Sequence, residues 1–381
     1  MRTLLKKSKN NSAILFAIFS ALLFVACKPE NRKIYSTTQT EAVSEENNWI
    51  AGCDTLPTME FRKIVVSDSS VLAKIRSDYK YSEPNSAEHK TLTTLNRKDF
   101  RFIRIKDTIV VPGEISDKIT DYSLFPACYP EARHLPKIVV VSNKYQCYAC
   151  YEDGKLIHYA AVNSGCEKSQ TYPGRYYMTW KQLDHKSSLD SNWHMPYTIN
   201  FHLQAGNAFH QFTMPGRPVS HSCIRQFRRD AKWIYEWSDR AKFDTCRNVI
   251  RNGTMVLVLD AFDFGRKRFG PWLDLTSNKE AGIQLPVNPE NYELPYIPIE
   301  QIPRGAREGL PGGYDRYKYA EDTLRARGII RSHVEISHSF NRNAHRRKLE
   351  REKQLSEQQQ QNAQQPEATT TEPENQIKTE E

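Results

Sequence analysis

The sequence predicts a mainly β protein. Its central domain is expected to be a small β-sandwich or partly closed barrel over residues 137–260, with a small N-terminal α/β module and an irregular C-terminal extension on either side. The apolar run Lys137–Val141 opens the central domain, and the continuous apolar run Thr254–Leu259 closes it as a buried strand. Between them, Asp153-Gly154 is typical of the tight turn of a β-hairpin.

The first 26 residues resemble a bacterial lipoprotein signal peptide. A basic start precedes the apolar run Ala13–Ala26, which is shorter than the roughly 20 residues that span a bilayer. The run ends at Cys27 in a lipobox-like sequence, so Cys27 is expected to become the lipidated first residue. The alternative is a short anchor that is not cleaved. We therefore expect a membrane-anchored lipoprotein that faces the periplasm or cell wall.

Two segments precede the central domain. Residues 27–60 are largely polar and predict a tether to the membrane. Residues 61–130 combine the helix-like stretch Ser70–Tyr79 with a later apolar strand, which predicts a small mixed module. Its last part faintly resembles the final strand of a LysM wall-binding repeat. The module is either a structural support or a carbohydrate-binding unit.

The charge of the chain suits an anionic surface. The formal net charge is +9, and removal of residues 1–26 takes away four positive charges, which leaves about +5. A modest basic excess fits a cell wall or membrane surface. Because no nucleic-acid-binding motif accompanies it, nucleic acid is not an expected partner.

Eight cysteines need an explanation. If Cys27 is lipidated and Cys223 is a free nucleophile, six are left, an even number compatible with disulfides in an oxidising compartment. Cys147 and Cys150 have the spacing of a redox or zinc motif. However, they fall in a predicted strand, where positions three apart face opposite sides. Buried or disulfide-bonded cysteines are therefore the preferred interpretation of this pair.

The C-terminal part has three sections. Apolar residues recur at three- and four-residue steps and predict an amphipathic helix, at Phe227, Ala231, Ile234, Trp237 and Ala241. Residues 261–340, the C-terminal extension, are rich in proline and aromatic residues without a clear period. Residues 341–381 are charged and Gln-rich, which predicts a disordered tail with a possible short helix.

The most informative stretch is Ser220-His221-Ser222-Cys223-Ile224-Arg225. Its cysteine, Cys223, follows His210 by thirteen residues. A cysteine becomes an effective nucleophile when a nearby histidine or a group of backbone N–H groups stabilises its thiolate. The spacing alone does not place the two side chains together. The fold has to bring two strands or loops into contact.

This stretch resembles the catalytic motif of the L,D-transpeptidases with a YkuD-type domain. Three further segments match the family in order, and they are the hairpin around Asp153-Gly154, Thr171–Tyr177 and His194–Tyr197. Gln211 and Ser222 stand where the family usually has glycine. Glycine beside a nucleophile often adopts a positive φ, so Ser222 is expected to be strained if the backbone requires that conformation.

The resemblance implies a role for each site residue. Cys223 attacks a stem-peptide carbonyl and His210 is its base, oriented by a backbone carbonyl; the alternative base is His221. Backbone amides around His221, Ser222 and Cys223 form the oxyanion hole. Three residues are expected to contact substrate, namely Ser220, Arg225 and Tyr197. Arg225 holds either a substrate carboxylate or a neighbouring acid, and Tyr197 lines the donor cleft.

The implied reaction is transfer of a tetrapeptide stem of peptidoglycan, with release of its terminal D-residue. The acceptor is left open between another stem, a protein, a D-amino acid and water, and water would make the protein an L,D-carboxypeptidase. A non-catalytic wall-binding lipoprotein is the alternative from another class. No cofactor is implied, and without an HExxH-like spacing no metal is expected. The partners expected are stem peptides and, through the lipid, a membrane; the oligomeric state is open.

Overall fold

The computed structural model describes residue 49 and residues 55–187, 190–246, 248–266, 270–339 and 342–363. The predicted signal peptide, the lipidation site Cys27 and most of the tether lie outside these residues. The chain divides into two units, Met1–Trp49 and Ile50–Glu381, and every element below belongs to the second. None of the helices in the described part combines the length and hydropathy that a bilayer crossing needs.

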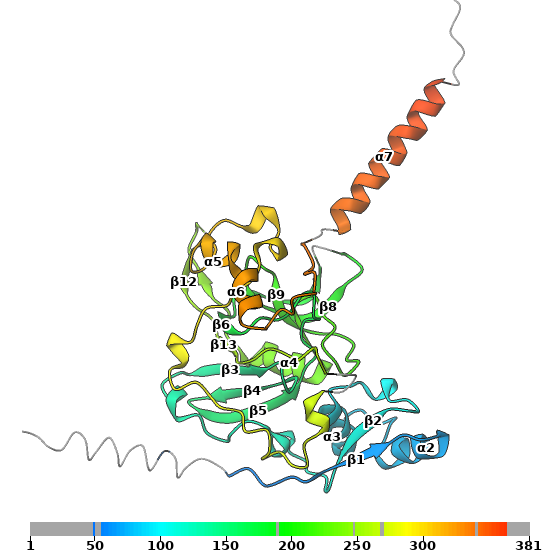
Figure 1. The fold of residues 1–381 in the computed structure, drawn as a ribbon, viewed down its shortest axis with the longest axis vertical. Coiled ribbons are helices and arrows are strands. Elements are labelled where there is room, and N and C mark those ends of the chain that lie inside the picture. Colours follow the sequence, from blue (N-terminus) through cyan, green and yellow to red (C-terminus); the bar gives the residue numbers. More distant parts are fainter. Residues whose placement is uncertain are drawn as a thin grey trace, which may run out of the picture. The chain divides into compact units, whose positions relative to one another are not determined.

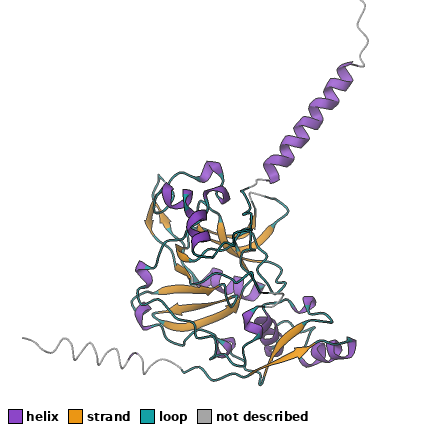
Figure 2. Ribbon diagram, in the orientation of Figure 1, coloured by secondary structure: helices purple, strands orange, loops and turns teal. Residues whose placement is uncertain are grey.

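The prediction of a mainly β fold is confirmed, and strands dominate the centre of the molecule (Figure 2). The strands are β1 (Phe61–Val65), β2 (Thr108–Pro112), β3 (Lys137–Ser142), β4 (Cys147–Glu152), β5 (Lys155–Ala161), β6 (Gly174–Tyr177), β7 (Lys181–Lys186), β8 (His194–His202), β9 (Asn207–Gln211), β10 (Ile224–Gln226), β11 (Lys242–Phe243), β12 (Val249–Arg251) and β13 (Met255–Val258). The α-helices are α2 (Ser69–Asp78), α3 (Ala87–Asn96), α4 (Arg228–Trp237), α5 (Tyr314–Lys318), α6 (Ala320–Ala326) and α7 (Arg342–Ala363).

The central domain consists of two open sheets. One has the order β5-β4-β3-β13-β6 and the other the order β10-β9-β8-β7. Since each has two edge strands, neither closes into a barrel. Apolar residues from both sheets form one shared core, including Val139 and Tyr148 from the first and Phe201 and Phe209 from the second. Of the two predicted architectures, the structure has the sandwich.

The predicted turn and the predicted placement of the cysteine pair in the first sheet both follow from local backbone geometry. Asp153 and Gly154 both adopt positive φ, of 47° and 75°, as the predicted two-residue turn between β4 and β5 requires. Cys147 and Cys150 face opposite sides of β4, because the first belongs to the outer core and the second to the core between the sheets. Both are buried and free, and Cys128 is disulfide-bonded.

The N-terminal module pairs β1 with β2 and packs α2 and α3 on its own small core (Figure 1). Asp68 caps the start of α2 by accepting from the N–H groups of Ser70 and Val71. The left-handed Arg97, with a φ of 51°, ends α3. This segment continues into contacts with the central domain, which are described with the site.

The predicted amphipathic helix is α4, and Ala231 and Ile234 point into the core between the sheets. It ends at Trp237, short of Ala241. Lys181 on β7 caps this end, because its ammonium donates to the carbonyls of Tyr235 and Ser238.

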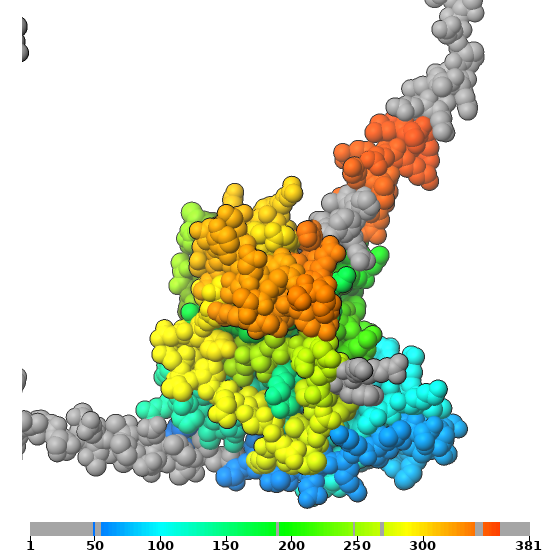
Figure 3. Space-filling view, in the orientation of Figure 1, coloured from blue at the N-terminus to red at the C-terminus, as the bar shows by residue number. Residues whose placement is uncertain are grey.

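The C-terminal extension is irregular, with short 3-10 helices and the two small helices α5 and α6. It is nevertheless well packed. Ile297, Ile302 and Leu324 belong to the core between the sheets, and Trp272 belongs to the outer core. In Figure 3 the extension, coloured yellow to orange, covers much of the face in view. The sequence gives no periodic signal here because these side chains reach the core from loops.

The described part of the tail is helical. Residues 342–363 form the 22-residue helix α7, which is longer than the short helix considered from the sequence. Its composition is rich in good helix formers, and ion pairs four residues apart, such as Lys348–Glu352, add support. The described side chains of α7 are exposed.

Candidate active site

His210 and Cys223 are brought together by two neighbouring parallel strands. β9 and β10 pair with Ile224 opposite Phe209 and Arg225 opposite His210. Phe209 and Ile224 point into the core between the sheets. Because side chains alternate along a strand, His210 and Arg225 point to the opposite face, and Cys223, just before β10, shares that face.

That face borders a cavity of about 580 Å³. We call it the larger cavity, because a second cavity beside the turn that carries Cys223 has a volume of about 230 Å³. Cys223, His210 and Arg225 line it together with Ser220 and His221. The β7–β8 hairpin and the extension, through Pro303, Gly305 and Ala306, supply further parts of the wall. The fold thus places six of the seven predicted site residues at or beside one cavity; the seventh, Tyr197, is elsewhere.

His210 has a defined tautomer and a low basicity. Its Nδ1 lies 3.0 Å from the carbonyl oxygen of Gln211, so Nδ1 carries the proton and donates it, which leaves Nε2 as an acceptor. This matches the expectation that a backbone carbonyl orients the ring. Burial, with the positive charge of Arg225 as a smaller contribution, lowers the pKa of His210 to about 4.

The surroundings of Cys223 favour its neutral thiol over the thiolate. Burial raises its pKa to about 11, although a backbone N–H of Ala208 and the charge of Arg225 act in the opposite direction. Its Sγ lies 3.8 Å from the carbonyl oxygen of Gly206. The electrostatics therefore favour a neutral thiol–imidazole pair, whereas the sequence motif suggested a thiolate stabilised by the histidine.

Ser222 adopts the conformation that its glycine-like position predicts, with a φ of +74°. Two hydrogen bonds hold its carbonyl oxygen, from Thr171 Oγ1 at 2.9 Å and from Asn207 Nδ2 at 3.2 Å. The hydroxyl of Ser220 donates to the carbonyl of Cys223. The turn that carries Cys223 is therefore held from several sides.

Arg225 is a half-buried cation without an acidic partner in the described part of the chain. Its guanidinium lies 4.6 Å from the ring centroid of Phe212, and no ion pair among the described residues involves it. Burial lowers its pKa from the ordinary value. It is also the only Lys, Arg, Asp or Glu among the described residues that line the larger cavity. Of the two predicted roles, pairing with a neighbouring acid is not seen in the described part of the chain.

Of the two remaining predicted site residues, His221 lines the larger cavity and Tyr197 does not. His221 is exposed, its ring lies 4.8 Å from that of Trp193, and it lines the larger cavity. Tyr197 does not line that cavity. Its ring packs on α4, 5.8 Å from the ring of Tyr235 and 5.2 Å from the guanidinium carbon of Arg228. Tyr197 has a positive φ of 55°, which interrupts the alternation of β8, and Met195 and Thr198 supply the cavity wall instead.

The loop between His210 and Cys223 is held by residues that the sequence motif did not indicate. Asp99, after α3, donates its N–H to the carbonyl of Met214 at 2.7 Å, and its carboxylate accepts from the N–H of Met214 at 2.9 Å. The buried Asn163 accepts from the N–H of Gly216 and donates to the carbonyl of Arg97, each at 3.0 Å. The N-terminal module therefore contacts the loop that precedes the nucleophile.

The Thr171–Tyr177 segment links the site to the extension. Thr171 holds the Ser222 carbonyl, as described above. Gly174 approaches Pro295 so closely that a Cβ would lie 2.6 Å from its Cα, so only glycine fits there. Among the described residues, no group of three or more His, Cys, Asp or Glu could hold a metal ion.

Comparisons with known proteins identify one matching family. Residues 136–258 match the family model of the YkuD L,D-transpeptidase catalytic domain. A search of curated proteins gives no match.

Solved structures similar to this chain include three bacterial L,D-transpeptidases. That of Stackebrandtia nassauensis is 26% identical, with 34% of this chain and 58% of that chain covered and a TM-score of 0.28. That of Mycobacterium smegmatis is 15% identical, with 33% and 59% covered and a TM-score of 0.27. That of Xylanimonas cellulosilytica is 22% identical, with 32% and 59% covered and a TM-score of 0.25. The similarity thus spans about three fifths of each solved chain. Residues 136–258 of this protein are an L,D-transpeptidase catalytic domain of the YkuD family.

Proposed function

We propose that this protein is a peptidoglycan L,D-transpeptidase that transfers tetrapeptide stems through a thioester on Cys223. One observation carries the proposal: Cys223, His210 and Arg225 share one face of two parallel strands and line one cavity. This arrangement supports the assignment of Cys223 as nucleophile, His210 as base and Arg225 as the carboxylate-binding cation, because all three line one substrate-sized space.

In the first step, the sulfur of Cys223 attacks the carbonyl carbon before the terminal D-residue of a stem. With a pKa of about 11 for the thiol and about 4 for the imidazole, the neutral pair predominates at neutral pH. The proton therefore moves to Nε2 of His210 as the carbon–sulfur bond forms. His210 then gives this proton to the departing amine of the D-residue, which leaves the stem as a thioester.

The turn at Ser222 stabilises the oxyanion of this step. We assign the donors to backbone N–H groups around His221, Ser222 and Cys223. Such donors act best when they are held in place before the reaction. Support comes from the two hydrogen bonds to the Ser222 carbonyl, which hold the turn in its left-handed conformation.

Arg225 binds a carboxylate of the donor stem. The support is its half-buried guanidinium, which no acid of the described residues neutralises, in the cavity that contains the thiol. A guanidinium holds a carboxylate by two parallel hydrogen bonds, which also orients the scissile bond. Ser220 and His221 border this donor position.

The place of action follows from the sequence alone. The lipobox-like end of the first 26 residues supports lipidation at Cys27 and an anchor on a membrane that faces the periplasm or cell wall. Fractionation and intact mass of a Cys27→Ser variant test this part. An unchanged membrane fraction together with an unchanged mass would contradict it.

The test of the chemistry uses a carbapenem and a tetrapeptide stem. Wild-type protein should gain the mass of one carbapenem and should release the terminal D-residue from the stem. Cys223→Ala should do neither while it keeps its thermal unfolding midpoint. Cys166→Ala is the matched control, because Cys166 is also a free, half-buried cysteine. A Cys223→Ala protein that still releases the D-residue would refute the proposal.

A further inference from the structure

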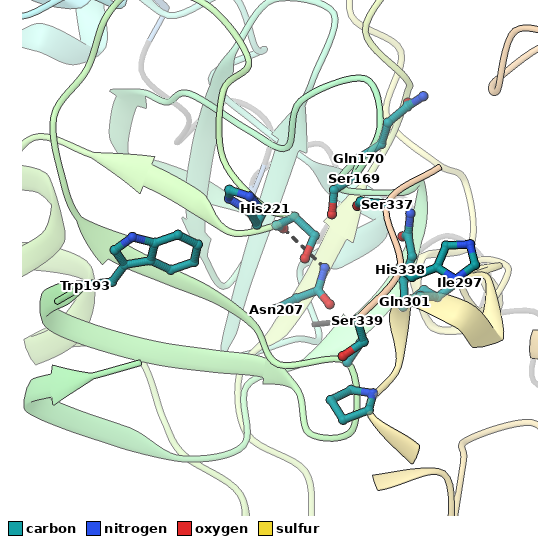
Figure 4. Close-up of a pocket in the computed structure, with 13 residues that line it drawn as sticks. Ser169, Gln170, Trp193, Asn207, His221, Ile297, Gln301, Ser337, His338 and Ser339 are labelled. Atoms are coloured by element: carbon teal, nitrogen blue, oxygen red, sulfur yellow. Dashed lines mark hydrogen bonds between the residues drawn. The ribbon is translucent and has the colours of Figure 1, made fainter. Parts of the chain in front are cut away.

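A second cavity lies on the other side of the nucleophile turn. It has a volume of about 230 Å³, and Figure 4 shows its lining. Ser222 and Asn207 line this smaller cavity, whereas Cys223 and Ala208 line the larger one, and His221 lines both. Adjacent residues on the turn and on β9 thus line different cavities, which places the turn that carries Cys223 between the two cavities.

The C-terminal extension builds much of the smaller cavity. Its contribution comes from Ile297, Gln301, Pro303 and the segment Ser337–Ser339. Figure 4 shows Gln301, Ser337, His338 and Ser339 on the side of the cavity opposite Trp193. None of these residues falls within residues 136–258, so this wall is a property of this chain rather than of its catalytic domain.

Hydrogen bonds hold that wall against the catalytic domain. The carbonyl oxygen of Lys168 accepts from the N–H of Ser337 at 2.8 Å and from Gln301 Nε2 at 3.0 Å. The N–H of Ser339 donates to the carbonyl of Glu300 at 2.7 Å. Since backbone groups make most of these contacts, the wall is in place before any ligand arrives.

Asn207 has a buried hydrogen-bond acceptor that lacks a donor among the described residues. It is 1% exposed, and its Nδ2 donates to the Ser222 carbonyl, which fixes the orientation of the amide. Its Oδ1 is buried and has no hydrogen-bond partner among the described residues. A buried acceptor without a donor is unfavourable. A ligand N–H in this cavity would provide the donor.

The charge of the two cavities differs in a way that matches two substrates. The larger cavity contains the cation of Arg225, while no Lys, Arg, Asp or Glu among the described residues lines the smaller one. An amine attacks only as the neutral base, and a nearby carboxylate would keep it protonated. A polar cavity without charged residues therefore suits an attacking amine. Its volume is below the roughly 300–1,000 Å³ of pockets for larger ligands, so it fits a group of amino-acid size.

We propose that the smaller cavity binds the acceptor as an amine-bearing group of amino-acid size, and that the extension determines which amines enter. This rests on the proposed function. The amine nitrogen attacks the thioester carbonyl, the N–C bond forms and the C–S bond breaks. The sulfur leaves with the bonding electrons, and the amine proton passes by way of His210 to Cys223. When water attacks instead, the product is the free acid of the shortened stem, a tripeptide without the terminal D-residue.

The experiment measures how one acyl-enzyme divides between amine and water. Wild-type protein acylated with a tetrapeptide stem is mixed with increasing isotope-labelled D-alanine, so that the aminolysis product differs in mass from the donor, and the ratio of aminolysis to hydrolysis is measured by mass spectrometry. We expect this ratio to saturate. In Ser339→Phe, which fills the cavity from the extension, we expect it to fall at least tenfold. Ser332→Phe is the matched control, because Ser332 is exposed on the same extension, and it should behave as wild type.

The outcomes separate the two proposals. If wild-type protein forms no acyl-enzyme, the proposed function fails. If it forms one but Ser339→Phe keeps the wild-type ratio, only the inference about the smaller cavity fails. A second arm replaces D-alanine with an intact stem peptide that has a free side-chain amine. Competition between the two amines would show one shared site, and the better substrate identifies the source of the acceptor.

A binding measurement without turnover gives an independent test. D-alanine should raise the thermal unfolding midpoint of the Cys223→Ala protein, and the added Ser339→Phe change should remove the effect. An equal shift in both proteins would place D-alanine outside the smaller cavity and overturn the inference.

Discussion

Replacing Ser222 by glycine tests the geometry of the nucleophile turn most directly. With a φ of +74°, Ser222 is in the left-handed region, which costs a residue with a Cβ about 1–2 kcal/mol. Glycine removes this strain but loses about 0.5–1 kcal/mol more conformational entropy on folding. The two hydrogen bonds to the carbonyl of Ser222 do not involve its side chain and remain. We therefore expect a net stabilisation of about 0.5–1 kcal/mol.

Thermal unfolding and carbapenem acylation measure the outcome. A gain of this size should raise the unfolding midpoint by about 1–4 °C, since about 1 kcal/mol corresponds to 2–4 °C in a domain of 150–250 residues. The acylation rate should stay at or above that of the wild type, because the turn keeps its conformation. Ser222→Ala separates the hydroxyl from the backbone, since alanine keeps the strain and lacks only the oxygen.

Ser220→Gly is the matched control two residues away. Ser220 is not among the residues with positive φ, and its hydroxyl donates to the Cys223 carbonyl, so glycine there should destabilise the protein. A lower midpoint for Ser222→Gly, or a tenfold loss in its acylation rate, would refute the strain argument. If Ser222→Ala shows the same loss, the hydroxyl has a role of its own.

Three further predictions follow from the site. Arg225→Gln should raise KM for a stem donor at least tenfold, since hydrogen bonds to charged groups contribute about 1.5–3 kcal/mol; an equal loss of alkylation by uncharged iodoacetamide would show that Arg225 acts on the thiol and not on the substrate. Asp99→Ala should lower the unfolding midpoint and the acylation rate because it leaves the Met214 N–H without its acceptor, while Asp99→Asn, which keeps an acceptor oxygen, should restore both; failure of the asparagine variant would argue against this positioning role. The third concerns pH. Because the pKa of His210 is about 4 in the folded protein and about 6.5 when unfolded, the unfolded state binds more protons between these values. The contribution of His210 to stability should therefore be complete above about pH 6.5 and should decline as the pH falls to about 4. Chemical denaturation of wild type and His210→Gln measures this contribution as their difference, and a difference that is the same at pH 4.5 and 7.5 would contradict the assigned pKa.

Several features of the fold and site are readable from the sequence because their causes are local. Asp153-Gly154 predicts its turn, since both residues tolerate positive φ. The alternation of β4 places Cys147 and Cys150 on opposite sides whatever the rest of the chain does. Ser222 stands where the similar motif usually has glycine, and this position predicts its positive φ. The motif also names the cysteine and histidine of the site.

The tertiary structure decided how these parts meet. The parallel pairing of β9 with β10 puts His210 and Arg225 on one face, and strand pairing of this kind leaves no mark in the spacing of the residues. Tertiary packing also places the ring of Tyr197 on α4 and leaves Arg225 without an acid among the described residues. The low pKa of His210 and the high pKa of Cys223 result from burial, which only the packed fold defines.

The largest gap concerns the segments that surround the site. Asp99 bonds to Met214 across 115 residues, and Gln170 Nε2 bonds to the carbonyl of Ile329 across 159 residues. Contacts this distant in sequence depend on where loops end in space, and a loop has no period that reveals which side it buries. The sequence by itself therefore determined the motif around Cys223 and the first and last strands of the central domain. The tertiary structure alone decided that the N-terminal module holds the nucleophile loop and that the extension forms part of both cavities, because these depend on long-range packing.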